Sequence, residues 1–172
     1  MRIELANLEG GKGEFSATYE TNQLELEDER VRLATPVTVN GRIKRSGAEV
    51  IVSGNISGQL FINCDRCLRP LEMPLDNQFE LEYVSGSDYE ELPDAELTEE
   101  QMAISVFDGV GIDVDEIVKE QVLLAVPTRL LCRDDCKGIC PNCGSDRNTT
   151  DCKCETSTSD PRWDALKSLK QQ

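Results

Sequence analysis

Eight cysteines and no histidine are present in this sequence, and six of the cysteines lie between residues 132 and 154, in the stretch CRDDCKGICPNCGSDRNTTDCKC. Such a density of thiols indicates either a disulfide framework or a site for a soft metal ion. The N-terminal stretch MRIELANLEGGKG lacks the cationic start and apolar run of a secretory signal, so we expect a cytoplasmic protein. Because cytosolic thiols are kept reduced, metal binding is the favoured use of the cysteines.

The eight cysteines form four local pairs: Cys64 with Cys67, Cys132 with Cys136, Cys140 with Cys143, and Cys152 with Cys154. The two-residue gap of the first and third pairs lets two sulfurs point at one metal from a single tight turn. Pro141 and Gly144 favour such a turn at the third pair. Four pairs are enough for two complete sites of four thiolates. Zinc is the favoured metal, and an iron–sulfur cluster or redox-active thiols and disulfides are the alternatives.

The sequence does not decide which pairs share an ion. We favour a local site made by the third and fourth pairs, because only eight residues separate them. The first and second pairs would then meet in another site, which closes a long loop of the chain. Both sites would be structural, since four thiolates fill a tetrahedron and leave no position for water or substrate.

Hydrophobic periodicity predicts an α+β fold. Apolar residues alternate with polar ones over 15–19, 37–43 and 71–83, which is typical of strands with one buried face. Gly54 and Gly58 interrupt the strand expected over 48–63, and we expect a bulge or bend there. A helix is predicted from Asp113 to the residues before Pro127. We therefore expect an antiparallel β-meander sheet or partial barrel covered by a helix, with a C-terminal cysteine-rich zinc knuckle and a short terminal helix.

The expected domain organisation has five parts. These are an antiparallel β domain with the first Cys-x2-Cys over 1–84, an acidic loop over 85–101, a short strand and packing helix of the same domain over 102–131, a cysteine-rich zinc module over 132–154, and a linker with a C-terminal helix over 155–172. The terminal helix carries one narrow apolar stripe, formed by Trp163, Leu166 and Leu169. We expect this stripe to dock on the parent domain, with a partner protein as the alternative.

Charge and composition limit the possible functions. The formal net charge is −15, and residues 88–120 hold twelve acidic side chains against one basic one. Such a surface repels phosphate and attracts basic proteins, although a solvated linker is the simpler interpretation. No apolar run approaches the roughly 20 residues of a membrane span. No phosphate-binding loop, nucleophile elbow or histidine is present, so we expect neither an enzyme nor a small-molecule substrate.

Three stretches together resemble the YceD family, the large ribosomal RNA subunit accumulation proteins: CDRCLRPL, then LAVPTRLLCRDDCKGICPNCGSDRN with CKC, and DPRWDALKSL. The resemblance covers roughly residues 30 to 170. It implies a non-enzymatic role in 23S rRNA accumulation, through assembly of the large ribosomal subunit.

We therefore expect a non-catalytic zinc-binding factor whose partner is a large-subunit component. The partner could be 23S rRNA, bound by the basic residues that flank the cysteines, or a basic ribosomal protein, held by the acidic block. The flanking basic residues are Arg66, Arg69, Arg129, Arg133, Lys137, Arg147 and Lys153. The alternative function is a metal- or redox-sensing regulatory protein whose thiolates release zinc on oxidation. The sequence predicts no oligomeric state.

Overall fold

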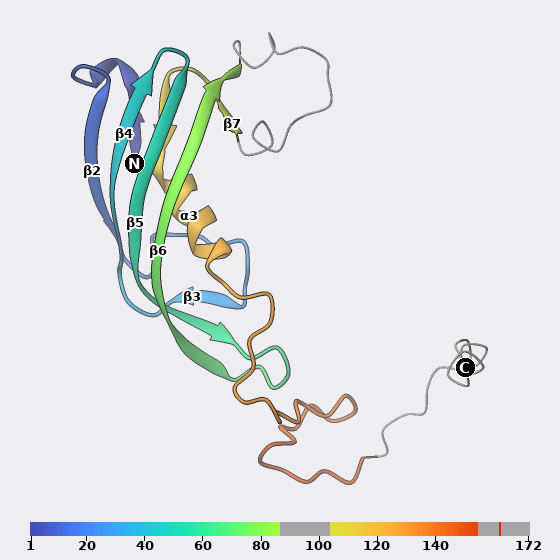
Figure 1. Cartoon of the computed structure of the whole chain (residues 1–172). Coiled ribbons are helices and arrows are strands. Elements are labelled where there is room, and N and C mark those ends of the chain that lie inside the picture. Colours follow the sequence, from blue (N-terminus) through green and yellow to red (C-terminus); the bar gives the residue numbers. More distant parts are fainter. Residues whose placement is uncertain (87–103, 155–161, 163–172) are drawn as a thin grey trace. The chain divides into compact units, whose positions relative to one another are not determined.

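The computed structural model describes residues 1–86, 104–154 and 162 (Figure 1). The chain divides into two compact units, which we describe separately. The first, called the β unit, consists of Met1–Asn63 and Pro70–Leu130. The second, called the cysteine unit, consists of Cys64–Arg69 and the chain from Leu131 onward. The cysteine unit therefore combines two segments that are far apart in the sequence.

The β unit is built on a six-stranded open sheet. Its strands are β2 (Lys12–Tyr19), β3 (Val31–Leu33), β4 (Val37–Ser46), β5 (Glu49–Asn63), β6 (Pro70–Ser85) and β7 (Ile104–Phe107). The strand order is β2-β4-β5-β6-β7, and β3 pairs with the end of β5. Neighbours are antiparallel except β6 and β7, which run parallel. The structure is thus α+β with a mostly antiparallel sheet, but the order is not a simple meander through β7.

Alternation of side chains places one face of the sheet in the core. Val37, Val39, Val50 and Val52 are fully buried, while the residues between them are more exposed. The hairpin between β4 and β5 turns at Gly47, whose φ of 66° suits a glycine. The two strands keep a continuous register on both sides of this turn.

Glycines within the strands make room for aromatic rings. Phe15, Gly41, Gly54 and Phe79 are direct cross-strand neighbours on four adjacent strands. A Cβ at Gly41 would lie 2.4 Å from Phe15 Cζ, and one at Gly54 would lie 2.8 Å from Phe79 Cζ. The pairing of β5 with β6 is unbroken through Gly54 and Gly58, so the bulge expected there is absent. The glycines are needed because two phenyl rings lie over the backbone.

A single helix in the described part of the chain packs on this core. Helix α3 (Val114–Leu124) follows the small sheet of β1 (Arg2–Glu4) and β8 (Gly111–Asp113), and the 3-10 turn η1 (Leu5–Asn7) follows β1. Asp113 is the N-cap and accepts from the Asp115 amide at 2.9 Å. The apolar side chains of α3 pack in the same core as those of the strands. The helix predicted over the last residues lies outside the described part.

Polar contacts also join α3 to the sheet. The Asn77 side chain on β6 donates to Gln121 Oε1 at 3.0 Å, and Gln121 is 5% exposed. The Tyr19 hydroxyl at the end of β2 donates to Asp115 Oδ1 at 2.6 Å. Burial and the Asp115 carboxylate raise the pKa of Tyr19, so this hydroxyl keeps its proton. These contacts fix the rotation of the helix on the core.

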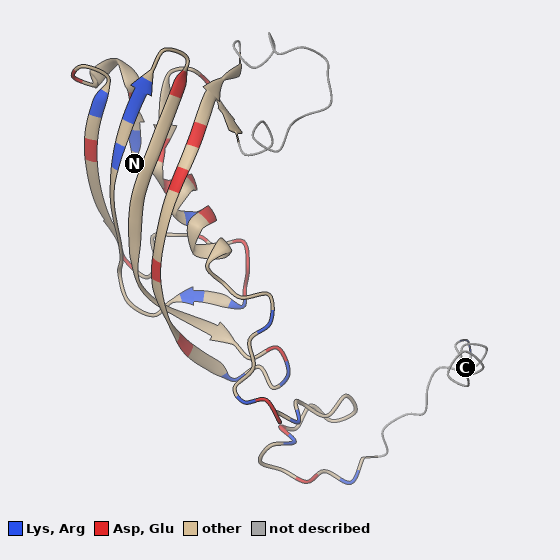
Figure 2. Cartoon of the chain, viewed as in Figure 1, with Lys and Arg blue, Asp and Glu red and all other residues tan. Residues whose placement is uncertain are grey.

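The charged residues are distributed unevenly over the strands, although β2 also carries Glu14, which forms an ion pair with Arg42 (Figure 2). Lys12, Arg42 and Lys44 lie on β2 and β4, while Glu80 and Glu82 lie on β6. Of the acidic block predicted over 88–120, residues 88–103 lie outside the described part. Within the described ranges, no helix has both the length and the apolar character needed to cross a bilayer.

Candidate metal centre

Two tight turns in the cysteine unit have the same backbone geometry. In the first knuckle, residues 64–69, the Leu68 amide donates to the Cys64 carbonyl at 2.9 Å, and the Cys64 amide donates to the Arg69 carbonyl at 2.8 Å. In both hydrogen bonds, the donor and the acceptor are at most five residues apart in the sequence. This pattern points the sulfurs of Cys64 and Cys67 to the same side of the turn.

The second knuckle, residues 140–145, repeats the pattern. The Gly144 amide donates to the Cys140 carbonyl at 2.9 Å, and the Cys140 amide donates to the Ser145 carbonyl at 2.8 Å. Gly144 has a φ of 72°, and Leu68 at the matching position has a φ of 59°. The two Cys-x2-Cys gaps therefore form equivalent knuckles although their intervening residues differ.

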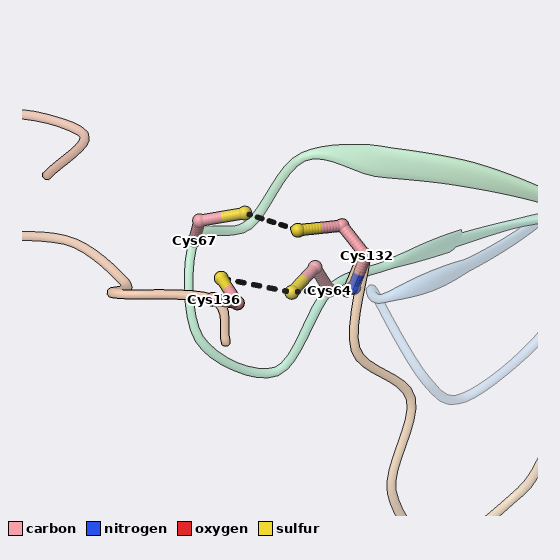
Figure 3. Close-up of side chains that lie close together, drawn as sticks. All are labelled: Cys64, Cys67, Cys132 and Cys136. Atoms are coloured by element: carbon pink, nitrogen blue, oxygen red, sulfur yellow. Dashed lines mark hydrogen bonds between the residues drawn. The ribbon is translucent and has the colours of Figure 1, made fainter. Parts of the chain in front are cut away.

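The first cluster consists of Cys64, Cys67, Cys132 and Cys136, whose sulfurs all lie within 4.8 Å of one another (Figure 3). The Sγ atoms of Cys64 and Cys136 are 3.9 Å apart, and those of Cys67 and Cys132 are 3.7 Å apart. A tetrahedron with metal–sulfur bonds of about 2.3 Å has sulfur–sulfur edges of about 3.8 Å. A disulfide would need about 2.05 Å. The donor set and its spacing therefore fit a tetrahedral thiolate site.

Burial and amide donors shape the ionisation of the first cluster. Burial raises the pKa of the Cys64 thiol, but backbone amides that donate to its sulfur lower the pKa to about 6. One of these donors is the Cys132 amide, at 3.3 Å. Burial and the neighbouring cysteine side chains raise the pKa of Cys132 to about 12. Without a cation the four sulfurs cannot all ionise, whereas a bound divalent ion would deprotonate them together.

The second cluster consists of Cys140, Cys143, Cys152 and Cys154, and its sulfurs also lie within 4.8 Å of one another. Cys140 is 3% exposed, but Cys143 is exposed and Cys152 is half-buried. Hydrogen bonds from the Ser145 hydroxyl and amide lower the pKa of Cys143 to about 6. The second cluster is thus chemically similar to the first but more open to solvent. The two sets of four are those that the sequence spacing favours, while their role as metal ligands stays a prediction.

Asn148 contacts a cysteine of the first cluster, and no role for it was predicted from the sequence. Its Oδ1 accepts from the Lys137 amide at 2.9 Å, and its Nδ2 donates to Cys136 Sγ at 3.5 Å. The same Nδ2 donates to Asp146 Oδ1 at 2.6 Å, and Asp146 forms an ion pair with Arg69 of the first knuckle at 3.4 Å. Such groups orient the ligands of a metal site and tune its affinity. The only signal in the sequence is an Asx-rich stretch between cysteines.

Several of the basic residues near the cysteines bind acceptors of their own unit. Arg66 donates to the Cys136 carbonyl at 2.8 Å. Arg133 donates to Asn148 Oδ1 at 2.9 Å and forms an ion pair with Asp135 at 3.1 Å. With the Arg69–Asp146 pair, three of the seven predicted RNA-contacting side chains thus stabilise the cysteine unit itself. Arg129 belongs to the β unit.

The part of the chain that carries both clusters also matches a known protein family. Residues 52–170 match the family described as "Large ribosomal RNA subunit accumulation protein YceD". The Bacillus subtilis (strain 168) protein YlbN is 30% identical over 161 residues, which cover 92% of this chain and 88% of YlbN. No solved structure matches.

More distant relatives are longer. A Mycobacterium leprae (strain TN) protein is 25% identical over 67% of this chain and 51% of its own length. The Arabidopsis thaliana "Large ribosomal RNA subunit accumulation protein YCED homolog 1, chloroplastic" is 24% identical over 80% of this chain and 50% of its own length. The chain therefore spans about half the length of these two relatives and most of YlbN. The family match and the similarity to YlbN together show that this chain belongs to the YceD family.

Proposed function

We propose that the protein is a non-catalytic, zinc-binding factor that supports 23S rRNA accumulation and assembly of the large ribosomal subunit. The observation that carries the proposal is the pair of four-sulfur clusters within the stretch that matches the YceD family. The family description refers to accumulation of the large ribosomal RNA and to no reaction. We place the protein in the cytoplasm, where reduced thiols are available for zinc.

In this proposal each cluster holds one zinc ion, and all eight cysteines are ligands. The first cluster joins residues 64–69 to the chain around 132–136, which are far apart in sequence. The second cluster closes a short loop over 140–154. Bound zinc would supply folding free energy to a unit with few buried apolar side chains, and it would not supply a reactive position. The β domain, acidic loop, zinc module and terminal segment expected from the sequence then form one assembly factor, in which residues 64–69 belong with the zinc module.

The test compares rRNA accumulation in cells that express the native chain or a Cys64→Ser, Cys67→Ser variant in place of the chromosomal copy. We expect the variant to lower the ratio of 23S to 16S rRNA and to accumulate large-subunit precursors. The matched control is Ser57→Ala, Ser53→Ala, which changes two hydroxyls of the same strand that precedes the first knuckle. A normal 23S to 16S ratio in the cysteine variant, with the protein present at its usual level, would contradict the proposal.

A second candidate function is a thiol-based metal or redox sensor. The observation that favours it is the exposure of Cys143 beside the buried Cys140 in the second cluster. An exposed thiolate whose pKa is lowered reacts readily with peroxide. This function requires that oxidation change the rRNA phenotype. A Cys143→Ser strain that responds to peroxide as the parent does, with the same rRNA profile, would exclude it.

A further inference from the structure

Leu68 occupies a backbone conformation that suits glycine. Its φ of 59° lies in the left-handed region, and it is the one such non-glycine residue in the described part of the chain. A side chain with a Cβ is disfavoured there because the Cβ approaches the following carbonyl oxygen. The matching position of the second knuckle is Gly144, with a φ of 72° and nothing within 4 Å of where a Cβ would stand. The same turn is thus built once with glycine and once with leucine.

Against the described residues, the Leu68 side chain gains little packing that would offset the cost of this conformation. Leu68 is 55% exposed, and it belongs to a turn whose two cysteines, Cys64 and Cys67, are 0% and 7% exposed. Ile139 is 39% exposed, and its amide donates to the Arg66 carbonyl of the same turn at 3.0 Å. Leu68 on the first knuckle and Ile139, which binds the knuckle through its backbone, are thus two large apolar residues exposed to solvent. In a small unit, such a pair marks a surface for another macromolecule.

The charge of the cysteine unit indicates what kind of macromolecule fits. Residues 64–69 and 131–154 carry six basic and five acidic side chains. Four thiolates around one divalent ion add two negative charges at each cluster, so the zinc-loaded unit is net negative. The guanidinium groups of Arg66, Arg69 and Arg133 are also bound to internal acceptors. This balance opposes RNA phosphate and is complementary to a basic protein.

We propose that Leu68, together with Ile139, whose backbone binds the same turn, is the apolar anchor by which the first knuckle docks into an apolar pocket of a basic large-subunit protein. The inference rests on the proposed function, and it specifies both the partner class and the contact. Leucine is kept at a glycine position because the side chain is used by the partner. The zinc clusters hold the turn in the shape that presents it.

The test uses the full-length, zinc-loaded chain and two probes prepared from the organism that encodes it. The probes are the proteins of the large ribosomal subunit freed of RNA, and 23S rRNA freed of protein. The retained protein is identified by mass spectrometry and purified, and its affinity is measured by calorimetry. The variants are Leu68→Gly and, as a matched control, Leu124→Ala, which trims a leucine of α3 that is 68% exposed.

We expect Leu68→Gly to keep both zinc ions and its melting temperature, because the backbone already has a glycine conformation. It should lose at least about tenfold in affinity for the retained basic protein, as a central apolar anchor does. Leu124→Ala should bind like the parent. A photoreactive residue at position 68 should crosslink to the same protein.

Four results would overturn the inference. Leu68→Gly could bind as tightly as the parent, which would remove the anchor and leave the proposed function intact. Crosslinks from position 68 could go to 23S rRNA, which would assign the leucine to RNA binding. Leu68→Gly could lose zinc or thermal stability, which would show that the leucine stabilises the turn itself. If the parent retains neither probe, the proposed function fails together with the inference.

Discussion

The side-chain amide of Asn148 donates to the sulfur of Cys136 at 3.5 Å, so a residue twelve positions after the cysteine orients it from outside the first cluster. The same side chain accepts from the Lys137 amide at 2.9 Å. Asn148 thus holds both the sulfur and the backbone that follows it.

Replacing Asn148 with alanine should weaken zinc binding at the first cluster. Loss of a residue that orients a ligand typically costs about 10- to 100-fold in metal affinity. The change in zinc affinity is measured by competition with a chromophoric chelator, starting from protein that holds two zinc ions per chain. Thr150→Ala is the control, since Thr150 is exposed and binds Asp146 through its backbone amide. Equal zinc affinity in the two variants would show that Asn148 does not tune the site.

The two clusters should lose zinc in a fixed order. Cys143 is exposed, whereas Cys64 is fully buried and its sulfur accepts from the Cys132 amide. Substoichiometric hydrogen peroxide should therefore oxidise two thiolates of the second cluster to a disulfide, with reduction of the peroxide to water and release of one zinc. Native mass spectrometry should show a species with one zinc before any species without zinc.

Peptide mapping after alkylation identifies which cysteines were oxidised. The Cys143→Ser variant serves as the control, because it should begin with one zinc and lose no further metal at the same dose. Simultaneous release of both ions, or oxidation of Cys64 and Cys67 first, would contradict the order.

Spacing along the chain favoured this grouping of the sulfurs without deciding it, and the structure brings the same two groups together. The pairs that contain Cys140 and Cys152 are close in sequence, which favours a shared site for them. Cys64 and Cys67 need only one tight turn to point their sulfurs at the same ion. Asn148 was not predictable, since asparagine in a loop serves many turns and caps equally well. The left-handed leucine at position 68 was also hidden, because no property of leucine indicates that conformation.

The strands were predictable for a similar reason, and their partners were not. Alternation over β2, β4 and β6 reports local exposure of each residue. The parallel pairing of β7 with β6 could not be predicted, because it depends on how the chain connects the two strands. Residues 87–103 of that connection lie outside the described part. Of the bulge or bend expected at Gly54, the bulge is absent. The glycine makes room for Phe79, which is 25 residues away and therefore invisible to a local pattern.

Substituting Gly41 with alanine should destabilise the β unit. The new Cβ would lie 2.4 Å from Phe15 Cζ and 2.8 Å from the Ser53 carbonyl oxygen, so a ring and a strand would both have to move. Overpacking of this kind costs about 1–3 kcal/mol. Urea denaturation followed by fluorescence measures the free energy of unfolding. The control is Gly86→Ala, where the nearest atom would be at 3.7 Å. A loss of stability that is the same in both variants would rule out the packing explanation.

Acid should remove one electrostatic contribution to the β unit. The Val110 amide, the Arg2 guanidinium and the Gly111 amide all bind the Asp108 carboxylate and lower its pKa to about 2. A carboxylate whose pKa is lower in the folded state stabilises the fold above its unfolded pKa of about 3.9, and this stability is lost as the pH falls toward 2. Asp108→Ala should therefore be less stable than the parent at pH 5 to 7, and the difference should narrow between pH 4 and pH 2. Because Asp108 is 52% exposed, added salt should also narrow the difference at neutral pH. Glu25→Ala, which removes an exposed acid, is the control and should be as stable as the parent at every pH. If the loss of stability in Asp108→Ala did not change with pH, the charge of Asp108 would not be what stabilises the turn.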